Sequence, residues 1–175
     1  EHDNLSDLVA QTTREFPKFQ DGAVFKYSKG DYKWVWKTGE ELLFRHVKKI
    51  EDYNGFHGHE YPFIGWNEIT KYPTRGLYDK FMSVNRCSFN PAKDTPKITK
   101  GSKVVYDTQD EKPLPEIPLE VFVTTNPNGP GHNWCKEEFV DPAPPGKIVK
   151  KTTEMENFVT GEKIVVTRTQ VRIFG

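Results

Sequence analysis

Hydrophobic positions near the amino terminus recur every three or four residues. Leu5, Leu8 and Val9 follow this spacing and predict an amphipathic helix. We expect the helix to end at Phe16, because the residue before a proline is pushed out of helical geometry. The chain therefore begins with a helix that has one apolar face.

Alternation with a period of two follows the helix. Ala23–Tyr27 is apolar and aromatic, and Tyr32–Lys37 and Glu40–Val47 each place large apolar side chains at every second position. The pattern predicts strands, the last two of which form a hairpin. Trp34 and Trp36 lie on one face of it, and we expect that face to belong to the core.

Two short apolar runs, Tyr61–Trp66 and Leu119–Thr125, are typical of strands buried in a parallel sheet. Between them, Thr74–Met82 predicts a helix and Arg86–Phe89 a short strand. Parallel strands need crossover connections, which such helical segments supply. The predicted fold class is therefore mixed α/β, with a mainly parallel core and antiparallel hairpin additions.

The remaining segments complete a single domain over residues 1–175. Residues 90–118 are rich in proline and charge and predict a long loop excursion with one small strand near Val104-Val105-Tyr106. A short helix is expected up to Phe139, and the strands Lys147–Phe158 and Lys163–Phe174 form a final hairpin.

Composition narrows the class of protein. The 175 residues carry 25 basic and 25 acidic side chains, so the formal net charge is zero, and 13% are aromatic. These values exclude a histone-like basic protein and a disordered chain. No apolar run approaches the roughly 20 residues of a membrane span, and we expect no membrane association. Cys87 and Cys135 are too few for a disulfide framework, which favours a reducing compartment.

Polar residues end both predicted parallel strands. The first ends in Trp66-Asn67-Glu68, and the second ends in Thr124-Thr125-Asn126. Ligands of open α/β sheets collect at the carboxyl ends of the strands. Glu68 is suited to orient a water molecule or accept its proton, and Asn126 to hydrogen-bond a phosphate oxygen. Ordinary strand termination by polar residues is the alternative explanation.

Two runs carry a family resemblance. Residues 61–70 (Tyr-Pro-Phe-Ile-Gly-Trp-Asn-Glu-Ile-Thr) resemble the acidic Walker-B strand of the large terminase subunit of tailed bacteriophages. Residues 124–134 (Thr-Thr-Asn-Pro-Asn-Gly-Pro-Gly-His-Asn-Trp) resemble the coupling motif of the same family, and they are the more specific of the two. The order of the other segments is also similar, so the resemblance extends over most of the chain.

The resemblance implies a P-loop NTPase-like ATPase that uses ATP and Mg²⁺ to drive viral DNA into a procapsid. Glu68 and Asn126 would be catalytic, Asn67 and Thr125 would contact the nucleotide, and Asn67 with Glu68 would hold Mg²⁺. The family has Asp where this chain has Asn67, and the missing charge should lower metal affinity. A weakened or degenerate ATPase is therefore an alternative.

The Gly-x-x-x-x-Gly-Lys-Ser/Thr phosphate loop does not occur in the 175 residues. The resemblance implies that this loop lies upstream of Glu1 and that a nuclease domain lies downstream of Gly175. The chain would then be a fragment of the ATPase domain, inactive alone and with no cofactor firmly expected. The implied partners of the whole protein are double-stranded viral DNA, the small terminase subunit, the portal protein and further copies in a ring, within the host cytoplasm.

Other residues suggest different chemistry. A non-catalytic module could stack single-stranded nucleic acid on Trp34 and Trp36. His57-Gly58-His59-Glu60 could be half of a zinc site completed by His132 or Cys135. Arg75 and Arg86 are candidates for an arginine inserted into a neighbouring ATPase site. For each of these, an ordinary structural role is the favoured explanation.

Overall fold

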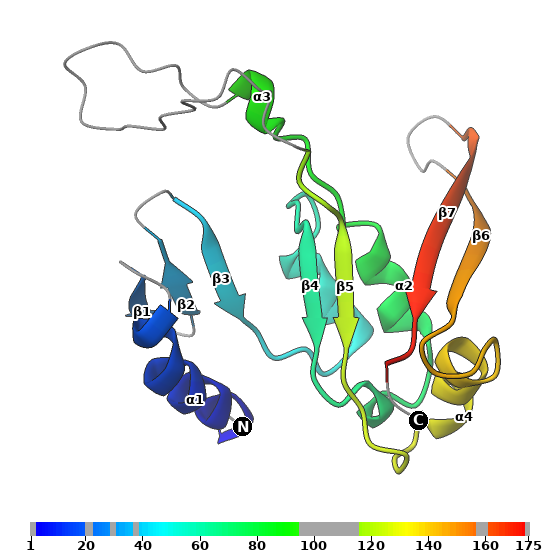
Figure 1. Ribbon diagram of the computed structural model, residues 1–175, viewed down its shortest axis with the longest axis horizontal. Coiled ribbons are helices and arrows are strands. Elements are labelled where there is room, and N and C mark those ends of the chain that lie inside the picture. The colour runs from blue at the N-terminus through cyan, green and yellow to red at the C-terminus, as the bar shows by residue number, and fades with distance from the viewer. Residues whose placement is uncertain are drawn as a thin grey trace. The chain divides into compact units, whose positions relative to one another are not determined.

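The computed structural model divides the chain into two compact units, Glu1–Asp52 and Tyr53–Gly175. Figure 1 shows the elements of both units. The single domain expected from the sequence spans the two. The structure describes residues 3–19, 23–28, 31–36, 39–94, 116–156 and 161–173.

The first unit is a helix with a three-stranded antiparallel sheet. Helix α1 (Asp3–Phe19) precedes β1 (Val24–Ser28), β2 (Asp31–Val35) and β3 (Glu41–Phe44), and the strands lie in the order β1-β2-β3. These elements confirm the predicted hairpin and add β1 to it. The predicted end of the helix at Phe16 is wrong. A proline removes only one helical hydrogen bond, and here the loss falls in the final turn.

Trp34 is the centre of the first unit. Its side chain is 3% exposed, and its indole Nε1 donates a hydrogen bond of 3.0 Å to Thr12 Oγ1 on α1. The rings of Phe16 and Phe25 lie 5.2 and 5.3 Å from it. The aromatic face of the hairpin therefore packs against α1, which confirms its place in the core.

The second unit contains the parallel pair of strands. Strand β4 (Phe63–Trp66) pairs with β5 (Glu120–Val123), with Ile64 opposite Val121 and Trp66 opposite Val123. The parallel arrangement predicted from the two apolar runs is confirmed. In the described residues, this is the one parallel pair, and the other strand pairs are antiparallel. The fold is mixed α/β with small sheets.

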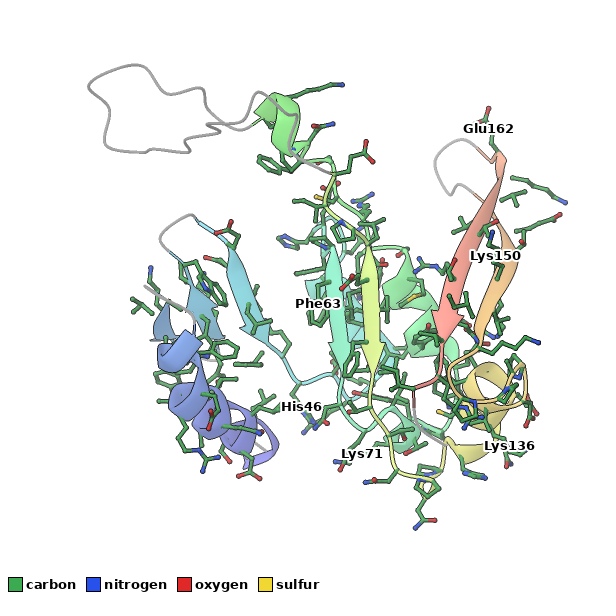
Figure 2. All side chains as sticks on the ribbon, in the orientation of Figure 1. His46, Phe63, Lys71, Lys136, Lys150 and Glu162 are labelled. Atoms are coloured by element: carbon green, nitrogen blue, oxygen red, sulfur yellow. The ribbon has the colours of Figure 1, made fainter. Side chains whose placement is uncertain are left out.

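Only one face of the parallel pair is covered within the described residues. Trp66 is 7% exposed and packs its indole against the rings of Tyr72 and Phe81, at 5.5 and 5.2 Å. On the opposite face, Phe63 and Phe122 are 50% and 52% exposed, and Figure 2 labels Phe63 on β4. The expectation of strands buried on both faces is therefore wrong for these residues.

The described part of the connection between β4 and β5 contains three short helical elements: η2 (Ile69–Lys71), α2 (Gly76–Met82) and α3 (Pro91–Asp94). A further 3₁₀ helix, η1 (Ile50–Gly55), precedes β4. Helix α2 confirms the helix predicted there. Residues 95–115 of the predicted excursion, including the small strand expected near Tyr106, lie outside the described residues.

The strand predicted at Arg86–Phe89 is wrong. Its backbone is held by a side chain instead of a neighbouring strand, because the Glu60 carboxylate accepts hydrogen bonds of 2.7 Å from both the amide and the hydroxyl of Ser88. Asn85 continues this arrangement, since its side-chain amide donates to the carbonyl groups of Tyr61 and Pro62 at 3.0 Å. Because side chains make these long-range contacts, residues 86–89 do not pair with a neighbouring strand.

The carboxyl-terminal part is a helix followed by a hairpin. Helix α4 (His132–Cys135) continues into a π-helical turn, η3 (Lys136–Val140), and β6 (Ile148–Glu156) then pairs with β7 (Lys163–Val171). The predicted helix and final hairpin are both confirmed. Among the described residues, no helix has the length and apolar character needed to cross a bilayer.

A buried carboxylate fastens the hairpin to the helices. Glu138 of η3 is 6% exposed, and its Oε2 lies 2.5 Å from Arg75 NH1 and 2.7 Å from Lys151 Nζ. Its backbone carbonyl accepts a further hydrogen bond of 2.9 Å from Gln170 Nε2. A buried carboxylate is tolerated when it is paired and hydrogen-bonded in this way. Glu138 therefore joins the start of α2, η3 and both strands of the hairpin.

Replacing Glu138 should destabilise the second unit. Removing one member of a buried ion pair typically costs 3–5 kcal/mol, and the part exposure of the two cations reduces the expected loss for Glu138→Ala to about 2 kcal/mol. Asp141→Ala removes an exposed partner of Lys136 and should cost less than about 1 kcal/mol. Urea unfolding, followed by the Trp66 indole signal in NMR spectra, compares the two. Equal losses would contradict the structural role of Glu138.

Candidate functional site

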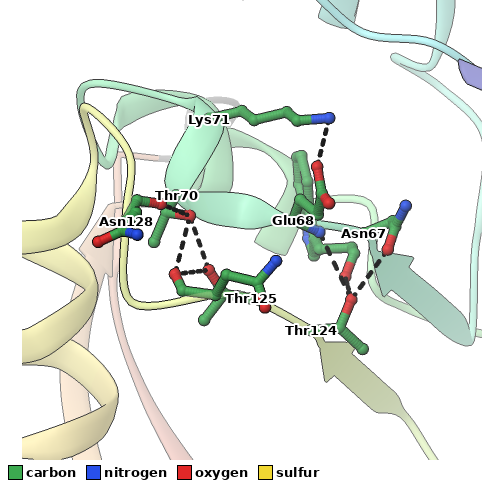
Figure 3. Close-up of polar contacts among 9 residues, drawn as sticks. Asn67, Glu68, Thr70, Lys71, Thr124, Thr125 and Asn128 are labelled. Atoms are coloured by element: carbon green, nitrogen blue, oxygen red, sulfur yellow. Dashed lines mark hydrogen bonds and ion pairs between the residues drawn. The ribbon is translucent and has the colours of Figure 1, made fainter.

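The polar residues that follow β4 and β5 lie at one edge of the parallel pair. Trp66 and Val123 are opposite each other in the register, so the chain leaves both strands at the same end (Figure 3). Asn67 and Glu68 follow the first strand, and the second continues into residues 124–126. We call Asn67, Glu68 and residues 124–126 the strand-end rim. The sequence predicted this meeting of the two segments.

Thr124 connects the two sides of the rim. Its Oγ1 donates to Asn67 Oδ1 at 3.1 Å and lies 3.4 Å from the amide nitrogen of Glu68. Its backbone carbonyl accepts from the Ile69 amide at 3.1 Å, which extends the ladder beyond the strands. Thr124 thus fixes the backbone of Glu68 and the side chain of Asn67. This role of Thr124 was not predicted from the sequence, although the register opposite Asn67 would have indicated it.

Thr125 is hydrogen-bonded to a buried threonine, Thr70. Its Oγ1 donates to Thr70 Oγ1 at 2.8 Å, and Thr70 is 4% exposed. The Thr70 hydroxyl donates in turn to the carbonyl of Asn128 at 3.0 Å or of Asn126 at 3.3 Å. The Thr125 hydroxyl, predicted to contact a nucleotide, is therefore part of this network (Figure 3). Thr70 was not predicted, because a single buried threonine leaves no pattern in the sequence.

Glu68 and Asn126 both reach solvent at the rim. The Glu68 side chain is 38% exposed and forms an ion pair with Lys71. Asn126 is exposed, and within the described part of the chain its side-chain amide has no hydrogen-bond partner, although its backbone carbonyl is engaged. A carboxylate and an amide are therefore presented from neighbouring strand ends. Carboxylates and amides are the types of side chain that can orient a water molecule and bind a phosphate oxygen.

The backbone of Glu68 is left-handed. Its φ and ψ are 54° and 58°, and it is the one non-glycine residue with positive φ among those that the structure describes. Such a conformation costs an L-residue about 1–2 kcal/mol, and strain of this kind clusters at functional sites. The turn at Glu68 directs the chain from β4 into η2.

The glycine-rich loop packs its backbone against the segment after Glu68. The Gly131 amide donates to the Thr70 carbonyl at 2.8 Å, and Trp134 Nε1 donates to the Tyr72 carbonyl at 2.8 Å. A Cβ on Gly131 would lie 2.1 Å from the Tyr72 oxygen, and one on Gly129 would lie 2.7 Å from the Thr70 oxygen. Only glycine permits so close an approach. The two motifs of the sequence are therefore in direct contact.

Gly131→Ala tests this contact. The added methyl group meets backbone oxygen that cannot move aside cheaply, so we expect a loss of about 2–3 kcal/mol in unfolding free energy. Gly55→Ala is the matched control, because a Cβ there meets nothing within 4 Å, and its effect should be within about 0.5 kcal/mol. Urea titration of both variants provides the comparison. A Gly131→Ala variant as stable as Gly55→Ala would show that the loop does not pack this way.

The strain at Glu68 is also measurable. Glu68→Ala and Glu68→Gly both remove the carboxylate and its ion pair, so they differ only in backbone preference. Glycine relieves the left-handed strain but gains freedom in the unfolded chain, which leaves Glu68→Gly more stable by about 0.5–1 kcal/mol. Equilibrium unfolding measures the difference. If the alanine variant is the more stable, the left-handed conformation does not persist in solution.

The oxygen atoms that the strand-end rim offers are of the kind that Mg²⁺ binds. Mg²⁺ takes one or two protein carboxylate or carbonyl oxygens and completes its shell with water and phosphate oxygens. Glu68 and Asn67 Oδ1 supply two such oxygens, and each is engaged by a donor, Lys71 and Thr124 respectively. A cation would therefore replace two existing contacts. Over the described ranges, no three His, Cys, Asp or Glu side chains gather as metal ligands.

Residues of the proposed zinc site have other contacts. Glu60 is bonded to Ser88, and the His57 ring packs edge-on against Tyr53 at 5.9 Å. The hydrogen bonds from the Ser88 hydroxyl and amide hold the pKa of Glu60 below its ordinary value. Burial raises the pKa of the Cys135 thiol to about 11, so it is protonated at neutral pH and is a poor nucleophile.

The remaining alternatives rest on residues with structural partners. Burial lowers the pKa of Arg75, but its hydrogen bond to Asp79 and the charge of Glu138 outweigh this and raise the pKa, so the guanidinium stays charged and held. Arg86 lies 3.6 Å from Glu60. Trp34 is buried and is not free to stack on a base.

Comparison with known proteins adds no assignment. No protein-family model, no curated protein and no solved structure matches the chain.

Proposed function

We propose that the strand-end rim is the hydrolytic edge of a nucleoside triphosphatase, and that the chain belongs to the ATPase motor of a phage DNA-packaging terminase. The observation that carries the proposal is the parallel register that joins the acidic strand end to the Thr-Thr-Asn-Pro strand end. Ligand chemistry in open α/β sheets is located at this edge. The resemblance of the two motifs to the terminase family supplies the particular class of ATPase.

Glu68 has the position for activating water. Its carboxylate is exposed at the rim, while its backbone is fixed by the Thr124 hydroxyl and by the turn into η2. In hydrolysis it would accept a hydrogen bond from the attacking water and align that water with the γ-phosphorus. Positioning is the main protein contribution to phosphoryl transfer, so a fixed backbone beneath a solvent-exposed carboxylate favours this role.

Asn126 would bind the γ-phosphate. Its amide group can donate to a phosphate oxygen, and its backbone is held by Thr70. Asn67 Oδ1 and Glu68 would hold Mg²⁺, which would neutralise charge on the phosphates. Because Asn67 brings no charge, the metal would bind more weakly than at a pair of carboxylates.

Contacts behind the rim suggest how loss of the phosphate would be transmitted. The loop after Asn126 reaches Thr70 through Gly131, and α4 follows it directly into η3. Glu138 of η3 is bonded to both β6 and β7 through Lys151 and Gln170. A change at Asn126 would therefore reach the hairpin through a continuous set of contacts. In the proposed motor, this is the route from hydrolysis to the parts that grip double-stranded DNA.

A phosphate loop must complete the proposed site. The 175 residues have no Gly-x-x-x-x-Gly-Lys-Ser/Thr run, so the cradle for the phosphates would come from another part of the polypeptide. Assembly as a ring, and contacts with a small terminase subunit and a portal, belong to this proposal as a whole. A weakened ATPase is the variant that Asn67 favours.

Glu68→Gln in the full-length product of the gene tests the proposal. Loss of the water-orienting carboxylate should lower Mg²⁺-dependent ATP hydrolysis about 100-fold or more, because general-base contributions are typically 10²–10⁴. Glu137→Gln is the matched control. Glu137 is exposed on η3, outside the rim, and its replacement should leave the rate unchanged.

A Glu68→Gln variant that hydrolyses ATP as fast as Glu137→Gln would refute the proposed role of Glu68. The 175-residue chain alone should show little or no hydrolysis, because its site has no phosphate cradle, and robust Mg²⁺-dependent hydrolysis by this chain would refute that expectation.

A further inference from the structure

Lys71 stands directly beside the proposed catalytic carboxylate. Its Nζ forms an ion pair with Glu68 Oε2, as Figure 3 shows, and the Lys71 amide donates to the Glu68 carbonyl at 3.0 Å. The two residues are three apart across the single 3₁₀ turn of η2. Side chains at this spacing eclipse each other in a 3₁₀ helix, so the turn itself brings the ammonium group to the carboxylate.

The turn that carries this pair is firmly anchored. Ile69 and Thr70, the two residues between the charges, are 0% and 4% exposed. The side chains of Glu68 and Lys71 are by contrast 38% and 61% exposed. The backbone is therefore fixed by burial, while the charged groups are free to exchange partners at the surface.

The ion pair between Lys71 and Glu68 is weak enough to be exchanged for another partner. Exposed ion pairs stabilise a fold by about 0–1 kcal/mol, so this one contributes little to folding. A contact of that size is readily displaced by a divalent cation, which attracts a carboxylate twice as strongly as a single charge does at the same distance. The pair is thus suited to reversible occupation of Glu68.

We propose that Lys71 is a positioning residue that holds the Glu68 carboxylate at the rim when no cation is bound, and that Mg²⁺ must displace it to bind there. The inference rests on the proposed function and extends it, because Lys71 then sets the metal affinity of a site that has one carboxylate.

Binding of Mn²⁺ as a probe for the Mg²⁺ site tests the inference without any hydrolysis. Mn²⁺ broadens amide NMR signals near its site, and signals of Asn67, Glu68 and Thr124 report on the rim. Lys71→Gln should lower the dissociation constant for Mn²⁺ about three- to tenfold, because it removes the competing charge. Lys71→Arg keeps that charge and should leave the constant near that of the unmodified chain.

Two further variants locate the effect. Lys136→Gln removes a cation from another exposed ion pair, with Asp141, and should leave Mn²⁺ binding unchanged; Figure 2 labels both lysines. Asn67→Asp adds a carboxylate to the rim and should tighten Mn²⁺ binding, which establishes that the metal is at this place. Unchanged amide signals of β4 and β5 verify that each variant keeps its fold.

The outcomes distinguish the role of Lys71 from the existence of the metal site. Tighter binding in both Lys71→Gln and Asn67→Asp supports the role of Lys71. If Asn67→Asp tightens binding but Lys71→Gln equals Lys136→Gln, the role of Lys71 is overturned while the proposed metal site stands. If Mn²⁺ broadens no rim signal in any variant, both the metal site and the role of Lys71 are overturned.

Discussion

The parallel pairing of β4 with β5 is the constraint on which the second unit depends. A parallel pair fixes not only which residues are neighbours but also at which end each strand finishes. Because Trp66 lies opposite Val123, the next residues of both strands continue the same ladder, and Thr124 bonds to both Asn67 and Glu68. A shift of one residue would turn the aromatic contacts of Trp66 away from α2 and separate the two polar ends.

Residues 61–70 and residues 124–134 satisfy each other's polar groups and pack against each other. The chain continues from Glu68 into a turn that contains the buried Thr70. The Thr70 hydroxyl has its hydrogen-bond partners in Thr125 and in the backbone carbonyls of the glycine-rich loop. The loop in turn has no regular structure of its own, and its glycines permit contact with the backbone after Glu68. This mutual packing offsets the cost of burying the Thr70 hydroxyl and of ordering the glycine-rich loop.

The periodicity of the sequence predicted most helices and strands, but it did not predict side-chain contacts between residues far apart in the chain. Alternation around Trp34 gave the aromatic hairpin, and the two apolar runs gave the parallel pair, because both depend on local pattern. The failed strand at Arg86–Phe89 depends on the Glu60 carboxylate, which lies far back in the sequence. Thr70 and Lys71 were missed for a similar reason, since a single turn of 3₁₀ helix has no period to detect. The catalytic roles of Glu68 and Asn126 stay predictions.

The β6–β7 hairpin is attached to the rest of its unit by polar groups. Lys151 reaches Glu138, Gln170 reaches its carbonyl, and Arg168 donates to Asn85 Oδ1 at 3.2 Å. Dissolved ions screen exposed charges strongly and buried pairs much less, so the pairing of the Glu138 carboxylate, which is 6% exposed, should persist in salt. The hairpin is thus joined to its unit by the geometry of paired polar groups, whereas Trp66 joins the parallel strands to α2 by apolar contact with Phe81.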